Sequence, residues 1–227
     1  MTKLSTQIGQ WTAWSETVVG YTYLAGYIAL LANFPISPWV SIQAFANEIG
    51  SSYYVALTGL QVLAFFQALL VLVLAISIYE YASPEKKILA RLGIVFALAF
   101  AILSSMHYYI QWVGVRQSIL RDDLTGLGLF VQFNFDSPIS AINMLGWMFF
   151  YGLTTLALAP IFERGRIENW IRWAFIINGI GCVLSAVLLA FGQKWVFLVW
   201  TVIISATWYA YPLLGILFRR MEIQTTL

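Results

Sequence analysis

Long apolar runs alternate along the chain with short polar connections. A helix needs about 20 mostly apolar residues to cross a bilayer, and six runs reach that length. We therefore predict an all-α fold, a polytopic transmembrane bundle of six helices that forms a single domain over residues 1–227. The predicted spans lie near residues 12–34, 55–79, 88–112, 138–161, 170–191 and 195–218.

The composition removes several classes of protein. Hydrophobic residues make up 61% of the chain and charged residues 10%, against about 45–50% and about 25% in soluble domains. This excludes a water-soluble globule, a disordered chain and a nucleic-acid binder. Cys182 and His107 are the single residues of their types, so we predict neither a disulfide framework nor a metal site. No cleaved signal peptide is predicted.

The basic residues predict an orientation. If the N-terminus is cytoplasmic, nine of the twelve Lys and Arg residues fall on the cytoplasmic side, as the positive-inside rule requires. Only Arg116, Arg121 and Lys194 fall on the other side. We therefore expect a cell membrane, the bacterial inner membrane by preference, with both termini in the cytoplasm. The cytoplasmic set is Lys3, Lys86, Lys87, Arg91, Arg164, Arg166, Arg172, Arg219 and Arg220.

Two connections on the outer side carry patterns of their own. Apolar residues from Trp39 to Ile49 recur at helical spacing, which predicts a short amphipathic helix over 38–49 on the outer membrane surface. A plain connector with one apolar side is the alternative. The outer loop, 113–137, is the longest connection, and apolar residues alternate with polar ones after Gly128. We expect a partly extended segment there that covers an outer cavity like a lid.

Polar side chains form two stripes on adjacent spans. In the third span they stand at i, i+3, i+4 and i+7, which is one helix face, and a similar stripe follows in the fourth span at the same depth. Together they predict a polar and aromatic cavity open to the non-cytoplasmic side. The alternative is that these groups only hydrogen-bond helices to one another. The candidate ligand-binding residues are Gln61, Ser104, His107, Tyr108, Gln111, Asn143 and Trp147.

Glu16 is the only acidic residue inside a predicted span, near the cytoplasmic end of 12–34. A hydrated glutamate at the membrane interface is one interpretation, and a role in transport or proton coupling is the other. Every lysine flanks a span, so a retinal Schiff base has no attachment point.

A further pattern runs from the end of the third predicted span into the outer loop, at Tyr108, Tyr109, Ile110, Gln111, Val115, Ser118, Ile119, Leu127, Gln132, Phe133 and Asn134. This pattern resembles a family of small six-helix bacterial membrane proteins of uncharacterised activity. The resemblance implies topology but no activity. The chain departs from the pattern at Phe135-Asp136-Ser137, where the family continues Pro-His-Gly, and at Asn143-Met144, where it carries an acidic pair.

These features favour binding or transport of a small hydrophobic or amphipathic molecule. An accessory subunit of a larger membrane complex is the first alternative. The second is an intramembrane enzyme, or a haem or pigment binder, that uses His107. We predict no catalytic residue and no cofactor. The expected partners are membrane lipid, a small hydrophobic ligand, and a second copy of the chain or a larger membrane complex.

Overall fold

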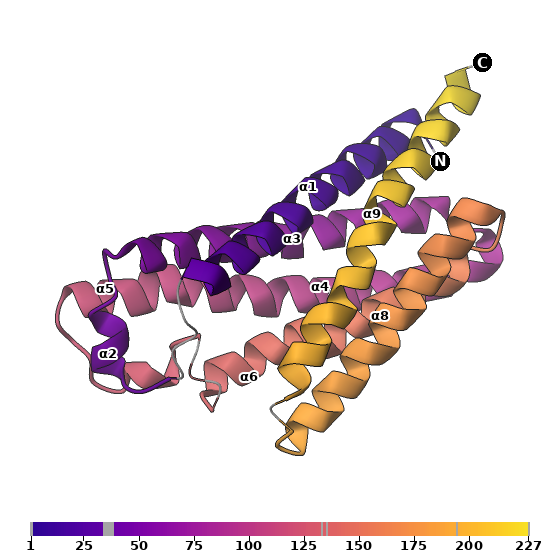
Figure 1. Cartoon of the computed structure of the whole chain (residues 1–227). Helices are drawn as coiled ribbons and strands as arrows, with labels where there is room; N and C mark the ends of the chain where they lie inside the picture. Colours follow the sequence, from indigo (N-terminus) through magenta and orange to yellow (C-terminus); the bar gives the residue numbers. More distant parts are fainter. Residues whose placement is uncertain (1, 34–38, 133, 135, 194, 227) are drawn as a thin grey trace.

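The computed structural model describes all residues except 1, 34–38, 133, 135, 194 and 227 (Figure 1). The described residues are helical and contain no strand. Two six-residue π-helical turns, Ile110–Val115 and Leu145–Phe150, join α4 to α5 and α6 to α7 without a break. The α-helices are α1 Lys3–Asn33, α2 Ile42–Ala46, α3 Ser52–Tyr81, α4 Lys87–Tyr109, α5 Arg116–Leu120, α6 Pro138–Met144, α7 Tyr151–Leu158, α8 Arg166–Ala190 and α9 Val196–Thr226.

Five helical stretches in the described residues are long and apolar enough to cross a membrane, which supports an all-α, membrane-embedded protein. α1 is long enough but is not among the five, because Glu16 and the Thr, Ser and Tyr residues around it lower its hydropathy. A sixth crossing by α1 therefore stays a prediction. The five stretches are Ser52–Tyr81, Pro84–Leu120, Pro138–Ile161, Arg166–Ala190 and Val199–Ile223.

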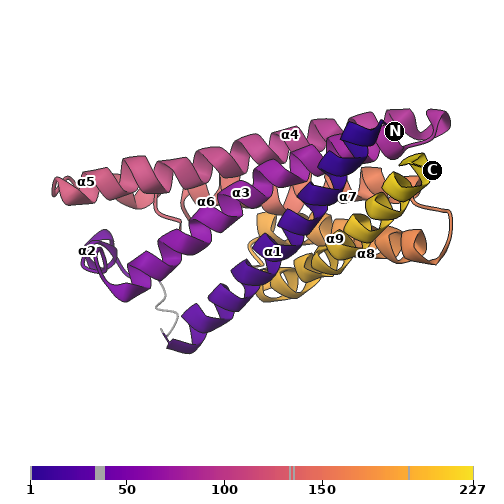
Figure 2. The same cartoon turned by 90° about the horizontal axis from the view of Figure 1, so that it is seen from above.

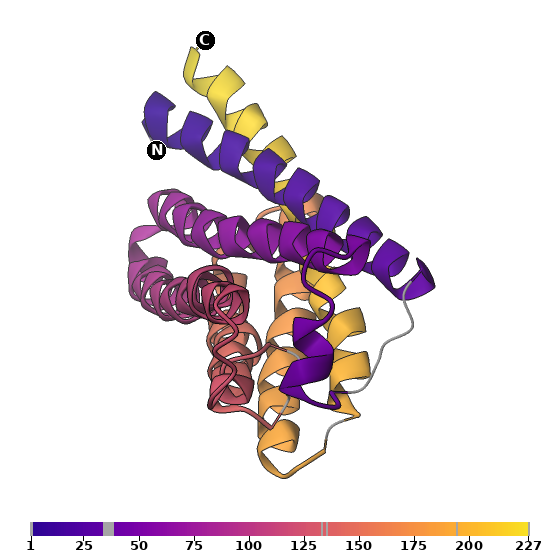
Figure 3. The same cartoon turned by 90° about the vertical axis from the view of Figure 1, so that its left-hand side faces the viewer.

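The long helices form a closed ring. α1 packs against α3, α3 against α4, α4 against α7, α7 against α8 and α8 against α9, and α9 returns to pack along α1 (Figures 1 and 3). Helices that follow one another in sequence are thus neighbours in space and run in opposite directions, as short connections require. The ring brings residues from both ends of the chain to one interior.

One end of the ring gathers the two termini and the turns that carry most of the basic residues (Figures 1 and 2). Gln7 Nε2 donates to Glu222 Oε1 at 2.7 Å, which joins α1 to α9. Lys86, before α4, forms an ion pair with Glu163, before α8, and this pairing holds the pKa of the Glu163 carboxyl below its usual value. Arg116 and Arg121 lie at the opposite end, on and just after α5.

The outer connections differ from what the sequence predicted. The third long helix continues past residue 112 to Leu120. The expected extended segment is wrong for the described residues, which form a tight 3₁₀ turn at Leu127–Leu129 and further turns. The amphipathic helix is confined to α2, capped by Ser41, and residue 38 lies outside the described residues.

Hydrophobic burial explains the shape of these connections. Val115, Leu127 and Val131 are buried together, and Trp39 and Phe45 pack on them. Contacts between segments distant in sequence therefore decide the loop conformation, over its local alternation.

α7 and α8 cross with almost no space between their backbones. A Cβ atom added at Gly179 would lie 2.9 Å from the carbonyl oxygen of Gly152 and 2.4 Å from Leu156 Cγ. Small residues at such crossings let helices approach closely in a membrane, where packing provides much of the association energy. This contact fixes one side of the ring.

We therefore expect Gly179→Ala to destabilise the fold by about 1–3 kcal/mol, since a backbone atom has to move to admit the methyl group. The measurement is the thermal unfolding midpoint in detergent. Gly59→Ala is the matched control, because a Cβ atom there meets nothing within 4 Å. Equal midpoints for the two variants would contradict the close crossing.

Candidate functional site

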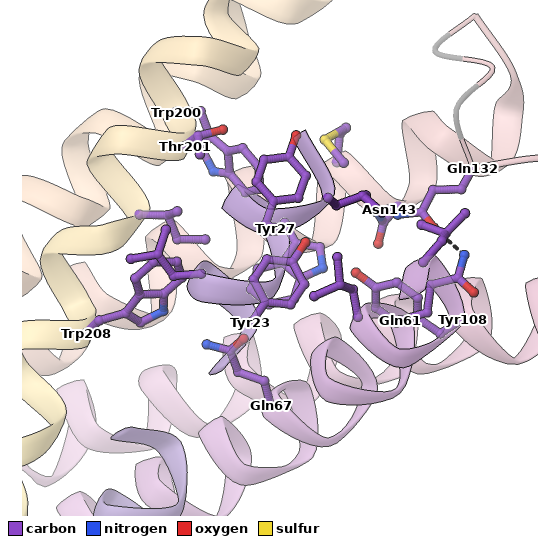
Figure 4. A pocket seen from close by; sticks show the side chains of 17 residues that line it. Tyr23, Tyr27, Gln61, Gln67, Tyr108, Gln132, Asn143, Trp200, Thr201 and Trp208 are labelled. Atoms are coloured by element: carbon purple, nitrogen blue, oxygen red, sulfur yellow. Dashed lines mark hydrogen bonds between the residues drawn. The ribbon is translucent and has the colours of Figure 1, made fainter. Parts of the chain in front are cut away.

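A cavity of about 160 Å³ lies inside the ring, and Figure 4 shows the side chains that line it. Its lining comes from α1, α3, α4, the loop before α6, the α6–α7 helix and α9. The lining residues of α1, α3 and α9 belong to the middle of these helices or to the halves that are remote from the termini. α8 supplies none of the lining residues found. The site is therefore assembled from segments at both ends and in the middle of the sequence.

Six aromatic side chains dominate the lining. In the view of Figure 4, two tryptophans of α9 lie opposite Tyr108 of α4, with two tyrosines of α1 between them. Close contact of α1 with α9 helps this arrangement, since a Cβ atom at Gly20 would lie 2.9 Å from Trp208 Cδ1. The six residues are Tyr23, Tyr27, Tyr108, Trp147, Trp200 and Trp208.

A network of amides fastens the outer loop over the cavity. Gln61 Nε2, on α3, donates to Gln132 Oε1 at 2.6 Å. Gln111 binds the loop backbone twice: its Nε2 donates to Phe130 O at 2.7 Å, and its Oε1 accepts from Gln132 N at 3.1 Å. Ser140 Oγ donates to Gln132 O at 2.7 Å. Because Gln132 also lines the cavity, the loop forms part of the cavity wall. The role of this loop as a lid on the outer side stays a prediction.

Several polar atoms of the lining have no hydrogen-bond partner in the described part of the chain. They are Asn143 Oδ1 and the indole N–H groups of Trp147, Trp200 and Trp208. The Trp200 indole lies beside the Cys182 thiol of α8 but completes no hydrogen bond with it. The Tyr108 hydroxyl lies beside Asn143 and Trp147 but completes no hydrogen bond with those two atoms. Buried polar atoms are nearly always paired, so both donors and an acceptor are available here to a bound molecule or to water.

The structure brings together four of the seven predicted ligand-binding residues. Gln61, Tyr108, Asn143 and Trp147 line the cavity, and Gln111 holds the loop that closes it. Their role in ligand binding stays a prediction.

Ser104 and His107 are buried but are not among the lining residues. They face the α6–α7 helix: Ser104 Oγ lies against Gly146, and His107 Nδ1 lies 3.3 Å from Ile139 O. His107 Nε2 is directed toward Gln132 without completing a hydrogen bond. The polar stripe of the third predicted span is therefore divided: Tyr108 lines the cavity, whereas Ser104 and His107 contact the α6–α7 helix.

Other lining residues were missed from the sequence, namely Tyr23, Tyr27, Gln67, Trp200 and Trp208. Tyr23 and Tyr27 share a helix face with Glu16, which is a signal that the sequence does contain. No sequence signal places α9 beside α1, so the two tryptophans could not be assigned in advance.

Glu16 does not lie at a helix end. α1 begins at Lys3, so Glu16 is near the middle of the helix, and its side chain is 0% exposed. The interpretation as a hydrated interfacial glutamate is therefore wrong. Neither carboxyl oxygen completes a hydrogen bond in the described structure, and the Gln67 amide is a polar neighbour.

Comparison of the chain with protein-family models, with curated proteins and with solved structures gave no match. Among the described residues, no three His, Cys, Asp or Glu side chains gather closely enough to hold a metal ion. The interpretation of the site therefore depends on its geometry.

Replacement of Gln111 should loosen the loop, because both of its hydrogen bonds go to the loop backbone. For Gln111→Ala we expect amide hydrogen exchange at residues 127–132 to accelerate about tenfold, the equivalent of about 1.4 kcal/mol of local stability. Gln117→Ala, at an exposed position one to two turns further on, is the control. Unchanged exchange in both variants would show that Gln111 does not hold the loop.

Proposed function

We propose that this chain is an integral membrane protein that binds a small amphipathic molecule in the cavity. The main support for this proposal is that a cavity with aromatic walls and unpaired polar atoms lies inside an otherwise packed helical ring. Small-molecule sites have this character, a mostly apolar wall with a few polar groups that fix orientation. A bound polar group would also remove the penalty of leaving those atoms unpaired.

The size of the cavity limits what can enter. At about 160 Å³ it is close to an engineered cavity of about 150 Å³ that admits benzene. The ligand, or the part of it that enters, is thus about as large as a six-membered ring. Indole N–H groups suit an oxygen acceptor on the ligand, and Asn143 Oδ1 suits a donor. A small molecule with a hydroxyl group satisfies both.

The distribution of basic residues supports one orientation of the protein in the membrane. The end with the termini and most of the basic residues faces the cytoplasm, by the positive-inside rule. The cavity lies in the other half, so its ligand enters from the outer leaflet or the space beyond it. In a bacterium, the membrane that contains the protein would be the inner membrane. Binding is the first step of any transport through the ring. His107 does not line the cavity, so the enzyme and pigment alternatives gain nothing from it.

Benzyl alcohol is a suitable probe, because its ring matches the cavity and its hydroxyl group can pair with the orphaned atoms. We expect saturable quenching of tryptophan fluorescence in the purified protein. Leu57→Phe, which fills the cavity from α3, should weaken binding at least tenfold. Leu69→Phe, on the exposed side of the same helix, should have no effect. Linear, non-saturable quenching in all three proteins would reject the proposed site.

A further inference from the structure

Glu16 belongs to a buried polar group at the middle of the ring. Tyr151 and Tyr211 lie within electrostatic reach of its carboxyl group, and the Gln67 amide interacts with it. These three side chains come from the middle of α3, of the Pro138–Ile161 helix and of α9. All are at most 2% exposed. An ionisable residue at such a depth marks a functional site by default.

Hydrogen-bond accounting shows that the hydroxyl groups around Glu16 have no proton to give it. Thr207 Oγ1 donates to Ile204 O at 2.8 Å, and the Tyr151 hydroxyl donates to Thr207 Oγ1 at 2.7 Å. Since each hydroxyl has one proton, the 2.6 Å contact between Tyr151 and Tyr211 requires Tyr211 to donate. Among the described side chains around it, a carboxylate at Glu16 would therefore find a donor only in the Gln67 amide.

Among the described residues, no basic side chain balances Glu16. The titratable groups that face it are Tyr151 from the α6–α7 helix and Tyr211 from α9, while α3 presents the neutral Gln67. The described Lys and Arg residues lie at the ends of the long helices or in connections. A carboxylate without a counter-charge is strongly disfavoured in such a place. Glu16 is thus a neutral acid unless a cation comes close.

The cavity next to this acid is suited to a cation. Gln67 both lines the cavity and interacts with Glu16, so the two sites share a side chain. The described lining residues include six aromatic side chains and no basic one. Aromatic faces attract cations, and quaternary ammonium groups are held by cages of such rings. In a low-dielectric interior a carboxylate acts on a charge beyond direct contact.

We propose that the ligand is a small organic monocation and that Glu16 releases its proton to become the counter-charge when the cation binds. The inference rests on the proposed binding function and names its substrate class. The exchange balances charge: one cation enters the cavity, the Glu16 O–H bond breaks, and one proton passes to the aqueous phase. The ring interior then has the same net charge in both states.

Choline and its neutral isostere 3,3-dimethylbutan-1-ol separate charge from shape, since they differ only in N⁺ against C. The purified full chain is titrated with each by calorimetry in two buffers of different ionisation enthalpy, which counts released protons. We expect choline to bind more tightly than the alcohol and to release one proton. Its apparent dissociation constant should fall about tenfold per pH unit while Glu16 is mostly protonated, because choline and the proton compete.

Glu16→Gln removes the exchangeable proton and preserves the shape of the side chain. It should lose choline binding and its pH dependence but still bind the neutral alcohol, which also shows that the variant is folded. Glu80→Gln, at an exposed position near the end of α3, is the matched control and should behave as the wild type.

Each other outcome counts against a particular claim. Equal affinity for the two isosteres, or choline binding that survives in Glu16→Gln, would overturn the cation inference and leave the binding function standing. Binding of benzyl alcohol without either isostere would do the same. If benzyl alcohol, choline and the neutral alcohol all fail to bind the wild type, the proposed function fails and the inference fails with it.

Discussion

A polar group inside a bilayer has to find its partner within the protein, because hydrocarbon offers none. This constraint explains most of the interior of the ring. Gln111 and Gln61 use their amides to bind the loop that contains the 3₁₀ turn at Leu127–Leu129. Asn178, on α8, donates to Thr155 Oγ1 at 3.1 Å and so joins two helices. Polar side chains that have found partners thus hold the ring and its outer loop together.

The same constraint applies to the buried polar atoms that have no hydrogen-bond partner in the described structure. Asn143, Trp147, Trp200 and Trp208, which contain four of these atoms, all line one cavity. Glu16 interacts with Gln67, which is another lining residue. If these groups served only to hold helices together, they would be expected to pair with one another, as Tyr151, Thr207 and Tyr211 do. Four of the eleven unpaired buried side-chain atoms in the described part of the chain belong to residues that line this cavity, and this favours a bound molecule over a purely structural role.

Two π-helical turns help to shape this interior. Gln111 lies in the first and Trp147 in the second, on helices that pack against each other. Such turns are rare among helices in general, but those that occur are frequently found at functional sites. Each inserts an extra residue into the helical register, so the helix face that continues beyond the turn is shifted. Here one turn presents Gln111 to the loop and the other presents Trp147 to the cavity.

Hydrophobic periodicity and the price of burying charge in a bilayer were enough to predict an all-α membrane protein, because both act locally along the chain. They also predicted that Gln61, Tyr108, Asn143 and Trp147 face inward. The closing contact of α1 with α9, the compact outer loop and the depth of Glu16 were decided only by the tertiary structure. A linear pattern shows which face of a helix is polar but not which helix lies opposite. That is why four of the six aromatic lining residues, and the depth at which Glu16 is buried, became apparent only in the tertiary structure.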